Sequence, residues 1–457
     1  MSLFALASGF YKAADFDPAL MDAITPVVDN DPVEPAIAQN TYWVGGNDTR
    51  LHRFENSYPL INGMAYNSYL ILDEKTALID TMDALCADEF FAHIAERLED
   101  RTLDYVIVNH MEPDHSATLG EVLNRWPQAQ VVCTSLAAKF IGQFFDPKLR
   151  DRCIIAAEGD ILVLGNHVLS FVEAPWVHWP EVMMTYDRLT HVLFTADAFG
   201  TFGSHEGSIF HHKLDLYAQN SCYDEARRFY CNIVGKYGSH VQAALKKIQT
   251  LDIATVASTH GPIFVGDFEK TLQGIDAWSS YTPESNGVAI FCGSVYGHTF
   301  EAVRYLEQKL NELGVENVTL YDAGCEHKSF LLADAFKCSH LVCASITYNN
   351  KVFSAMRDFL ADLQDHHLQS RHVSFIENGS WHANSAKLMR SMFESMPDMV
   401  EVGEAVSLKS RMTEDTRATL DNLAQAIAAS LAGDTTYEKR LSDPLPAADT
   451  VSGASRH

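Results

Sequence analysis

Short apolar runs alternate with polar turns along the first part of the chain, from about Asn40 onward. Five of these runs predict strands, and they occupy residues 41–45, 65–74, 75–81, 103–110 and 129–134. A helical pattern of apolar positions over residues 88–100 lies between two of them. Strands and helices in alternation predict an α/β domain, which ends near residues 260–270.

The alternation becomes regular in the second part of the chain. Strands are predicted at residues 287–294, 317–323, 339–347, 372–380 and 399–408. Helices are predicted between and after them, at residues 300–314, 329–337, 350–363, 385–396 and 414–433. Five strands separated by helices predict a doubly wound parallel five-stranded sheet.

The polar segment 279–287 separates the two patterns and is predicted to be a linker. We therefore expect a first domain at residues 31–278 and a second domain at residues 286–433. Residues 1–30 are rich in Asp and Pro and are expected to form an extension. Residues 434–457 are rich in Pro, Ser and Ala and are expected to be disordered. A length of 457 residues agrees with two domains.

A dense group of polar side chains follows the apolar run at residues 103–108. The potential metal ligands in it are His110, Glu112, Asp114 and His115. They can converge only if the chain turns sharply, and Pro113 helps to set such a turn. A charged loop that happens to hold two histidines is the alternative. Four donors within six residues favour a metal site.

Three later segments each place a polar residue directly after an apolar run. These residues are His178, Asp197 and His260. Each lies past the C-terminal end of a predicted strand, where α/β folds place their sites. One such residue alone is more often a turn cap than a ligand. Four such segments in one domain favour a single shared site.

The motif His-x-Glu-x-Asp-His, followed by His, Asp and His, resembles the metallo-β-lactamase fold, which is an αββα sandwich. Hydrolases of that fold usually have His at the third motif position and bind zinc, whereas Glu112 is similar to the flavodiiron family. The resemblance implies one iron held by His110, Glu112 and His178. It implies a second iron held by Asp114, His115 and His260, with Asp197 bridging the two.

The donor set itself is four imidazoles and three carboxylates. Hard oxygen donors favour iron more than thiolates would, but zinc also accepts His and Asp. The identity of the metal therefore depends on Glu112 and on the second domain. A zinc-dependent metallo-hydrolase that acquired the second domain is the alternative.

A loop with small and hydroxyl residues joins the strand at residues 287–293 to the next helix. It consists of Ser294, Val295, Tyr296, Gly297, His298 and Thr299. Hydroxyls and backbone N–H groups at a helix N-terminus suit a phosphate group. The loop resembles the phosphate loop of flavodoxins, although His298 stands where many members of that family have Asn.

Two further loops follow the third and fourth strands of this domain. They contain Ser345, Thr347, Tyr348 and Asn349, and Asn378, Gly379, Ser380 and Trp381. They resemble the loops beside the isoalloxazine ring in flavodoxin-like domains, with Tyr348 and Trp381 next to the ring. An ordinary surface aromatic is the alternative for Trp381. The fingerprint G-x-G-x-x-G is absent here, so FMN is expected and NAD is not.

Charge and cysteine content narrow the partners and the compartment. Lys and Arg total 34 against 60 Asp and Glu, a net charge of −26 that repels nucleic acid and anionic lipid. Nine cysteines without a C-x-x-C pair indicate reduced thiols in a cytoplasm, and no rubredoxin module within these residues. We expect neither a membrane helix, which needs about 20 apolar residues, nor a signal peptide.

The two cofactors together predict an oxidoreductase active in oxygen or nitrosative stress defence. Two reduced irons and a fully reduced FMN hold the four electrons that convert dioxygen to two waters. Dioxygen reduction is therefore expected, and reduction of nitric oxide to nitrous oxide is the alternative. A pure electron-transfer flavoprotein is a further alternative, against which the seven intact ligand positions argue.

The flavodiiron resemblance also implies partners. It implies a head-to-tail homodimer or a dimer of dimers, and a separate electron donor such as a rubredoxin or a flavin reductase. His52 is expected to be either a residue beside the metal pocket or a solvated loop histidine. No role is assigned to His211 and His212.

Overall fold

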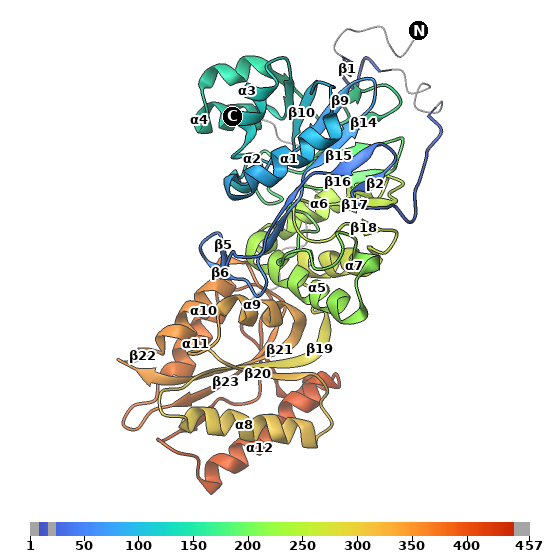
Figure 1. The fold of residues 1–457 in the computed structure, drawn as a ribbon. Coiled ribbons are helices and arrows are strands. Elements are labelled where there is room, and N and C mark those ends of the chain that lie inside the picture. The colour runs from blue at the N-terminus through green and yellow to red at the C-terminus, as the bar shows by residue number, and fades with distance from the viewer. Residues whose placement is uncertain (1–8, 17–23, 443–457) are drawn as a thin grey trace. The chain divides into compact units, whose positions relative to one another are not determined.

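The computed structural model describes residues 9–16 and 24–442 of the chain. The chain divides into two compact units, Met1–Asp276 and Ala277–His457. Figure 1 shows the first unit in blue to yellow-green and the second in yellow to red.

Two seven-stranded sheets form the first unit, in the part that the structure describes. One sheet has the order β1 (Phe10–Tyr11), β13 (Ile161–Val163), β14 (Val168–Glu173), β15 (Met183–Asp187), β16 (Val192–Phe194), β17 (Thr255–Ala257) and β18 (Phe264–Val265). The other has the order β12 (Cys153–Ile155), β11 (Gln130–Cys133), β10 (Tyr105–Val108), β9 (Thr76–Ile79), β8 (Tyr69–Leu72), β3 (Thr41–Trp43) and β2 (Ala36–Ala38). Two small pairs accompany them, β4 (Gly46–Asp48) with β7 (Met64–Tyr66) and β5 (Arg53–Phe54) with β6 (Tyr58–Pro59).

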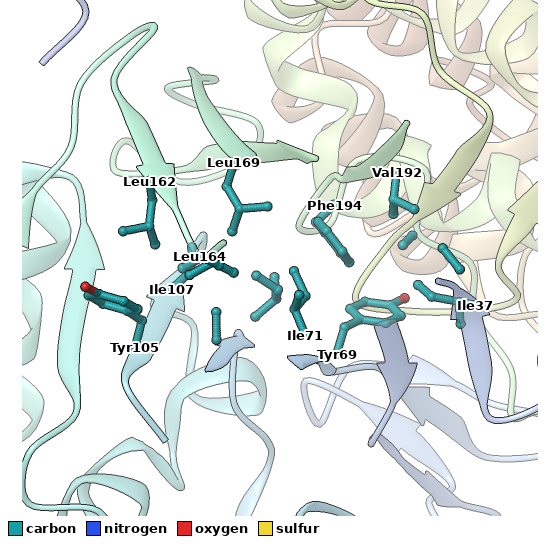
Figure 2. Close-up of a cluster of buried hydrophobic side chains, with 14 of the residues drawn as sticks. Ile37, Tyr69, Ile71, Tyr105, Ile107, Leu162, Leu164, Leu169, Val192 and Phe194 are labelled. Carbon is teal, nitrogen blue, oxygen red and sulfur yellow. The ribbon is translucent and has the colours of Figure 1, made fainter. Parts of the chain in front are cut away.

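The hydrophobic core of this unit lies between the two sheets (Figure 2). Ile71 and Ile107 reach it from one sheet, and Leu169 and Phe194 reach it from the other. Each of these side chains is at most 1% exposed. Burial of one such side chain contributes about 2 kcal/mol, so the facing pair of sheets is the main source of stability here.

Helices flank the two sheets and complete the predicted αββα sandwich. They are α1 (Ala87–Leu98), α2 (Pro113–Ser116), α3 (Leu119–Arg125), α4 (Ser135–Phe144), α5 (Leu216–Phe229), α6 (Gly238–Ile248) and α7 (Glu269–Ser279). In α1 the buried side chains are Phe90, Phe91, Ile94 and Leu98, which recur every three or four residues. This spacing gives one apolar face that packs toward a sheet.

The second unit is the predicted doubly wound sheet. Its strands are β19 (Ser285–Gly293), β20 (Val318–Asp322), β21 (Cys338–Tyr348), β22 (Lys351–Val352), β23 (His372–Asn378), β24 (Val400–Val402), β25 (Val406–Leu408) and β26 (Glu438–Arg440). Its helices are α8 (His298–Glu312), α9 (Lys328–Lys337), α10 (Ser354–Asp365), α11 (Ser385–Phe393) and α12 (Glu414–Leu431). The order β20-β19-β21-β23-β24 is parallel throughout. In Figure 1, α8 and α12 cover one face of this sheet and α9, α10 and α11 the other.

Three details differ from the expected elements. The predicted strand at residues 399–408 is two strands, β24 and β25, because Gly403 turns the backbone with a φ of 71°. The predicted extension contributes β1, which pairs with β13. The segment expected to be disordered from residue 434 contributes β26, which pairs antiparallel with β24. Residues 1–8, 17–23 and 443–457, on which parts of these two predictions fall, lie outside the described residues.

Helix composition also bears on the membrane. Among the described residues, no helix combines the length and the apolar character that a membrane crossing requires.

A buried histidine that stacks on a partly exposed one makes the stability of the second unit depend on pH. The rings of His340 and His372 stack with centroids 4.5 Å apart, and His340 is 4% exposed. Burial, together with the neighbouring His372, lowers the pKa of His340 to about 3. An unfolded His340 takes up a proton near its ordinary pKa of about 6.5, whereas the folded one does not. The folded state therefore loses stability as the pH falls from about 6.5 toward 3.

We predict that His340→Gln reduces this acid destabilisation. Each pH unit in that window is expected to cost the parent about 1.4 kcal/mol more than the variant, because glutamine binds no proton. The free energy of unfolding of the second unit is measured by urea denaturation at pH 8 and at pH 4. Amide hydrogen exchange in β21 and β23 reports on this unit. At pH 8 His340 is neutral, so its titration contributes nothing there. Parallel pH profiles for parent and variant would contradict the prediction.

Candidate functional site

The seven sequence-predicted metal residues come together at one end of the first unit. His110 follows β10 after one residue, and Glu112 caps the short helix α2, which carries Asp114 and His115. The other three lie in loops, with His178 between β14 and β15, Asp197 after β16 and His260 after β17. The end of each preceding strand therefore fixes where the donor atoms stand.

The donor atoms form two groups. His110, Glu112, His178 and Asp197 make up the first, and Asp114, His115 and His260 the second. In the first group, the Nε2 atom of His178 lies 3.0 Å from Glu112 Oε2 and 3.0 Å from Asp197 Oδ2. In the second group, the Nε2 atoms of His115 and His260 lie 3.2 and 3.1 Å from Asp114 Oδ2.

Asp197 connects the two groups through its two oxygens. Its Oδ2 atom lies 3.3 Å from His110 Nε2 and 3.0 Å from His178 Nε2, in the first group. Its Oδ1 atom lies 3.0 Å from His115 Nε2, in the second group. The hydroxyl of Thr259 donates to Oδ1 at 2.5 Å and holds the carboxylate in this orientation. One carboxylate thus faces two sets of donors.

The electrostatics of the pocket favour bound cations. Burial alone would keep these imidazoles neutral, yet the facing carboxylates outweigh it and raise the pKa of His115 and of His178 to about 9. Although burial opposes it, the same imidazoles hold the pKa of Asp197 well below its ordinary value. Both shifts show that buried negative charge attracts positive charge at this point.

Several buried donor atoms are left without a hydrogen bond in the described structure. They are both carboxylate oxygens of Asp114, Nε2 of His260, and both ring nitrogens of His115. An unpaired buried polar atom costs about 1–3 kcal/mol. Carboxylate oxygens and imidazole nitrogens that face one another in this way fit metal ions that would coordinate them.

Buried polar residues behind the donors hold them in place. Glu181 accepts a hydrogen bond from His110 Nδ1 at 2.8 Å and from the backbone N–H of Met111 at 3.0 Å. This contact leaves His110 Nε2 to face the pocket. Asp80 accepts from the backbone N–H groups of Asn109 and His110, at 2.7 and 3.3 Å, and burial raises the pKa of Asp80 to about 6. Such carboxylates orient metal-binding histidines.

Sequence reasoning missed these supporting carboxylates. Glu181 lies three residues after His178, and Asp80 ends a predicted strand, so both stood in segments already identified. Their partners are 71 and 30 residues distant in sequence, which only the fold reveals.

The segment around His52 contributes a different residue from the one expected. His52 is exposed, as in the solvated alternative. Glu55 instead lies beside Glu112, and desolvation, the charge of Glu112 and a hydrogen bond to it raise the pKa of Glu55 to about 8. His211, for which no role was assigned, pairs with Asp267 at 2.5 Å and packs on the ring of Phe264.

Aromatic rings enclose the second group of donors. The ring of His260 lies 5.2 Å from that of Phe54, and 5.5 Å from those of Tyr66 and Phe229. A cavity of about 270 Å³ borders the same turn, with Thr201, His205 and Gly261 among its lining residues. His260 thus lies among apolar rings, which strengthen its interaction with a cation.

The predicted flavin residues come together at one edge of the second unit. The loops after β19, β21 and β23 adjoin because these strands are parallel neighbours, with Gly293 opposite Ser345 and Ser345 opposite Glu377. This edge is the C-terminal end of the sheet, where doubly wound folds bind ligands. The switch in strand order lies between β19 and β21.

The loop of residues 294–299 leads directly into α8. Gly297 adopts a φ of 90°, which a glycine tolerates, and its N–H donates to the hydroxyl of Ser294 at 3.2 Å. The helix begins at His298 and runs for 15 residues, so its N-terminus presents backbone N–H groups and a positive dipole end. This arrangement fits a phosphate group.

Large aromatic side chains stand exposed at the same edge. Trp381 is 93% exposed, Tyr296 89% and Tyr348 50%. Ser345, Thr299 and Asn378 are buried and satisfied within the protein, with Asn378 Nδ2 donating to Thr299 Oγ1 at 3.2 Å. The exposed aromatics, together with the phosphate-type loop, match a flat ring that carries a phosphate.

Comparison with known proteins agrees with both units. Residues 64–261 match the family model described as ODP family beta lactamase. The anaerobic nitric oxide reductase flavorubredoxin of Pectobacterium atrosepticum is 28% identical over 371 residues, which cover 79% of this chain and 71% of that protein. The flavorubredoxin of Aeromonas hydrophila is 29% identical and covers 76% of this chain and 70% of its own length.

Solved structures show the same fold. Rubredoxin oxygen:oxidoreductase from Desulfovibrio gigas superposes with a TM-score of 0.80 at 23% identity, over 88% of this chain and 99% of that one. The flavodiiron protein of Giardia intestinalis gives a TM-score of 0.80 at 22% identity over the same shares. The resemblance inferred from the sequence is confirmed: the chain has the two-domain fold of the flavodiiron proteins, and residues 64–261 match the ODP family beta lactamase model.

Proposed function

We propose that the chain is an oxidoreductase that reduces a small diatomic molecule, with dioxygen as the first candidate. The reaction takes place between the two donor groups of the first unit, with electrons relayed by FMN at the second. The observation that carries the proposal is Asp197, whose two oxygens face different sets of histidines. A carboxylate placed in this way suits two metal ions at one site.

The ligand roles follow the two groups. One iron would be held by His110, Glu112 and His178, the other by Asp114, His115 and His260, and Asp197 would offer one oxygen to each group. Bound iron would supply the chemistry that binds and reduces the diatomic molecule, with FMN as the source of electrons. The set contains three carboxylates, whose hard oxygen donors favour iron. Softer metals prefer thiolate ligands, which this set lacks. Glu112 in place of histidine distinguishes the set from that of the zinc hydrolases.

The chain's own residues prepare the pocket. Glu181 and Thr259 hold His110 and Asp197 in fixed orientations. The rings around His260 exclude water from one side of the pocket. Glu55 stands beside Glu112 at the exposed side of the pocket, so in its ionised form it adds negative charge next to the first group.

The second unit holds FMN at its C-terminal edge. Ser294 and the N-terminus of α8 would bind the phosphate, through a hydroxyl and through backbone N–H groups. Tyr348, the last residue of β21, and Trp381, which follows the neighbouring strand β23, would lie next to the ring. Because the Ser345 and Asn378 side chains are already hydrogen-bonded within the protein, backbone groups at these strand ends would be the ones available to the ring.

The second candidate substrate is nitric oxide. Relatives that cover most of this chain are named anaerobic nitric oxide reductase flavorubredoxin, whereas a structural neighbour is named rubredoxin oxygen:oxidoreductase. We propose a separate donor protein, such as a rubredoxin or a flavin reductase. We also propose a head-to-tail homodimer or dimer of dimers, in which FMN of one copy serves the metals of the other.

Gas consumption tests the function. The full chain is reduced completely without oxygen, and the removal of dioxygen and of nitric oxide is followed in separate samples. Rapid removal of either gas is expected, and the ratio of the two rates identifies the substrate. If neither gas is removed by protein that holds two irons and FMN, the proposal is wrong. Hydrolytic activity without reductant would favour the zinc-dependent alternative.

Replacing Glu181 tests the support of the first group. We predict that Glu181→Gln weakens the binding of one metal ion about 10–100-fold, because the charge that fixes His110 is lost. Metal release to a chelator measures this change. Glu158→Gln, at a half-exposed carboxylate, is the matched control and is expected to change nothing. Equal release from both variants would contradict the assigned role.

A further inference from the structure

One buried amide clamps the turn that carries His260. Asn67 lies between β7 and β8 and is 1% exposed. Its Nδ2 atom donates to the carbonyl of Ser258 at 2.9 Å and to that of Gly261 at 2.8 Å. Its backbone N–H donates to the carbonyl of Thr259 at 2.7 Å. Three hydrogen bonds from one residue therefore fix the backbone on both sides of His260.

The same strand segment also fixes the ring of His260. The carbonyl of Ala65 accepts a hydrogen bond from His260 Nδ1 at 2.9 Å. Because Nδ1 carries the proton in this bond, Nε2 is the atom left to face Asp114, at 3.1 Å. Residues 65–67 thus hold both the backbone and the ring of one donor.

Two further side chains determine which way the Asn67 amide points. Its Oδ1 atom accepts hydrogen bonds from Trp43 Nε1 at 2.9 Å and from His205 Nε2 at 3.0 Å. An indole N–H can only donate, so the atom beside it is the oxygen and the nitrogen faces the two carbonyls. All four hydrogen-bonding positions of the amide are used. Rotation of the amide would oppose donor to donor and acceptor to acceptor.

We propose that Asn67, locked by Trp43 and His205, is the positioning residue for the metal ion of the second group. It acts through His260 and touches no metal itself. The inference rests on the proposed function for the presence of two metal ions. Each group of donors is therefore positioned by a different residue, the first by Glu181 and the second by Asn67.

Asn67 is expected to affect the binding of one metal ion only, whereas a residue with a general structural role would affect both. Asn67→Asp keeps the size of the side chain but removes both N–H donors to Ser258 and Gly261. Loss of an outer partner of a metal ligand typically weakens metal binding about 10–100-fold. We therefore expect the variant to release one ion about 10–100-fold faster than the parent and the other at the parent's rate.

The experiment follows metal release from the full chain. Ferrous iron is loaded without oxygen, excess chelator is added, and the rate of each ion's release is measured. Asn67→Asp is expected to accelerate one phase and Glu181→Gln the other, and the double variant is expected to accelerate both. Acceleration of both phases by Asn67→Asp alone, or of neither, would overturn the proposal.

A milder variant tests the lock. Trp43→Phe keeps an aromatic ring but removes the indole N–H, so the phase that Glu181→Gln leaves at the parent's rate is expected to quicken measurably, by up to about tenfold. If Asn67→Asp does not fold, this variant decides: an unchanged phase overturns the proposal. A parent that binds zinc in place of iron contradicts the proposed function. The release assay run with zinc still tests Asn67 in that case.

Discussion

Replacing Asp197 by alanine is expected to remove both metal ions at once while FMN stays bound. Its two oxygens face separate groups of donors, so the substitution takes a ligand from each. Loss of an outer-shell partner already costs about 10–100-fold in affinity, and loss of a shared ligand is expected to cost more than 100-fold at both positions. Reduction of either gas is expected to disappear with the metal. Metal and flavin analysis of the purified variant measures both effects.

A matched variant separates the ligand role from folding. Asp187 is also a fully buried aspartate of the first unit, but it pairs with His167 at 2.8 Å, away from the seven donors. Asp187→Ala is expected to lower stability and to keep the metal in protein that remains folded. Retained iron and full activity in Asp197→Ala would show that the ligand assignment is wrong.

Replacing Arg371 by methionine is expected to destabilise the second unit by about 3–5 kcal/mol. The guanidinium is 1% exposed and donates to backbone carbonyls from three segments: Nε to Ala335, Nη2 to Phe336, and Nη1 to Tyr281, Gln369 and Ser370. Methionine fills much of the space but leaves these buried acceptors unpaired. Unpaired buried groups cost about 1–3 kcal/mol each, and some relaxation offsets the sum. Urea unfolding of the second unit measures the loss.

Two other substitutions provide the comparison, one to lysine at position 371 and one at a partly exposed arginine of the same unit. Arg371→Lys keeps the charge, but its single ammonium group cannot reach all three segments, so an intermediate loss is expected. Arg417 on α12 is partly exposed, and Arg417→Met is expected to change stability by less than about 0.5 kcal/mol. A loss at Arg371 as small as that at Arg417 would contradict the role of this buried network.

The metal residues were predictable because each follows a strand end that the sequence reveals. His110, Asp197 and His260 all come directly after short apolar runs, and the fold brings such ends to one edge. The local motif from His110 to His115 also signals a turn. What the pattern cannot reveal is the pairing of the two Asp197 oxygens with different histidines, since it depends on side-chain orientation in the folded chain.

The residues that hold the metal donors in place could not be predicted either, because their contacts also depend on the folded chain. Asn67 binds carbonyls 191 and 194 residues away, and Glu181 binds a histidine 71 residues away. Neither residue has a periodicity or spacing that marks it. The roles of these side chains depend on their burial and on their hydrogen-bond partners. Both result from the packing of segments that are distant in sequence.

In the second unit, the alternation of strands and helices was sufficient for the fold but not for its edges. The apolar positions at residues 399–408 predict one strand, and the positive φ of Gly403 divides it. The strand β26 has the sequence Glu-Lys-Arg, which no apolar pattern identifies. Its antiparallel pairing with β24 relies on backbone hydrogen bonds at the sheet edge.

The composition of the purified full chain tests the central claim most directly. Iron, zinc and FMN are measured on the same sample after expression in medium that contains both metals. We expect about two irons and one FMN for each chain, with iron lost selectively in Asp197→Ala. Zinc in the place of iron, or a chain that binds no flavin, would contradict it.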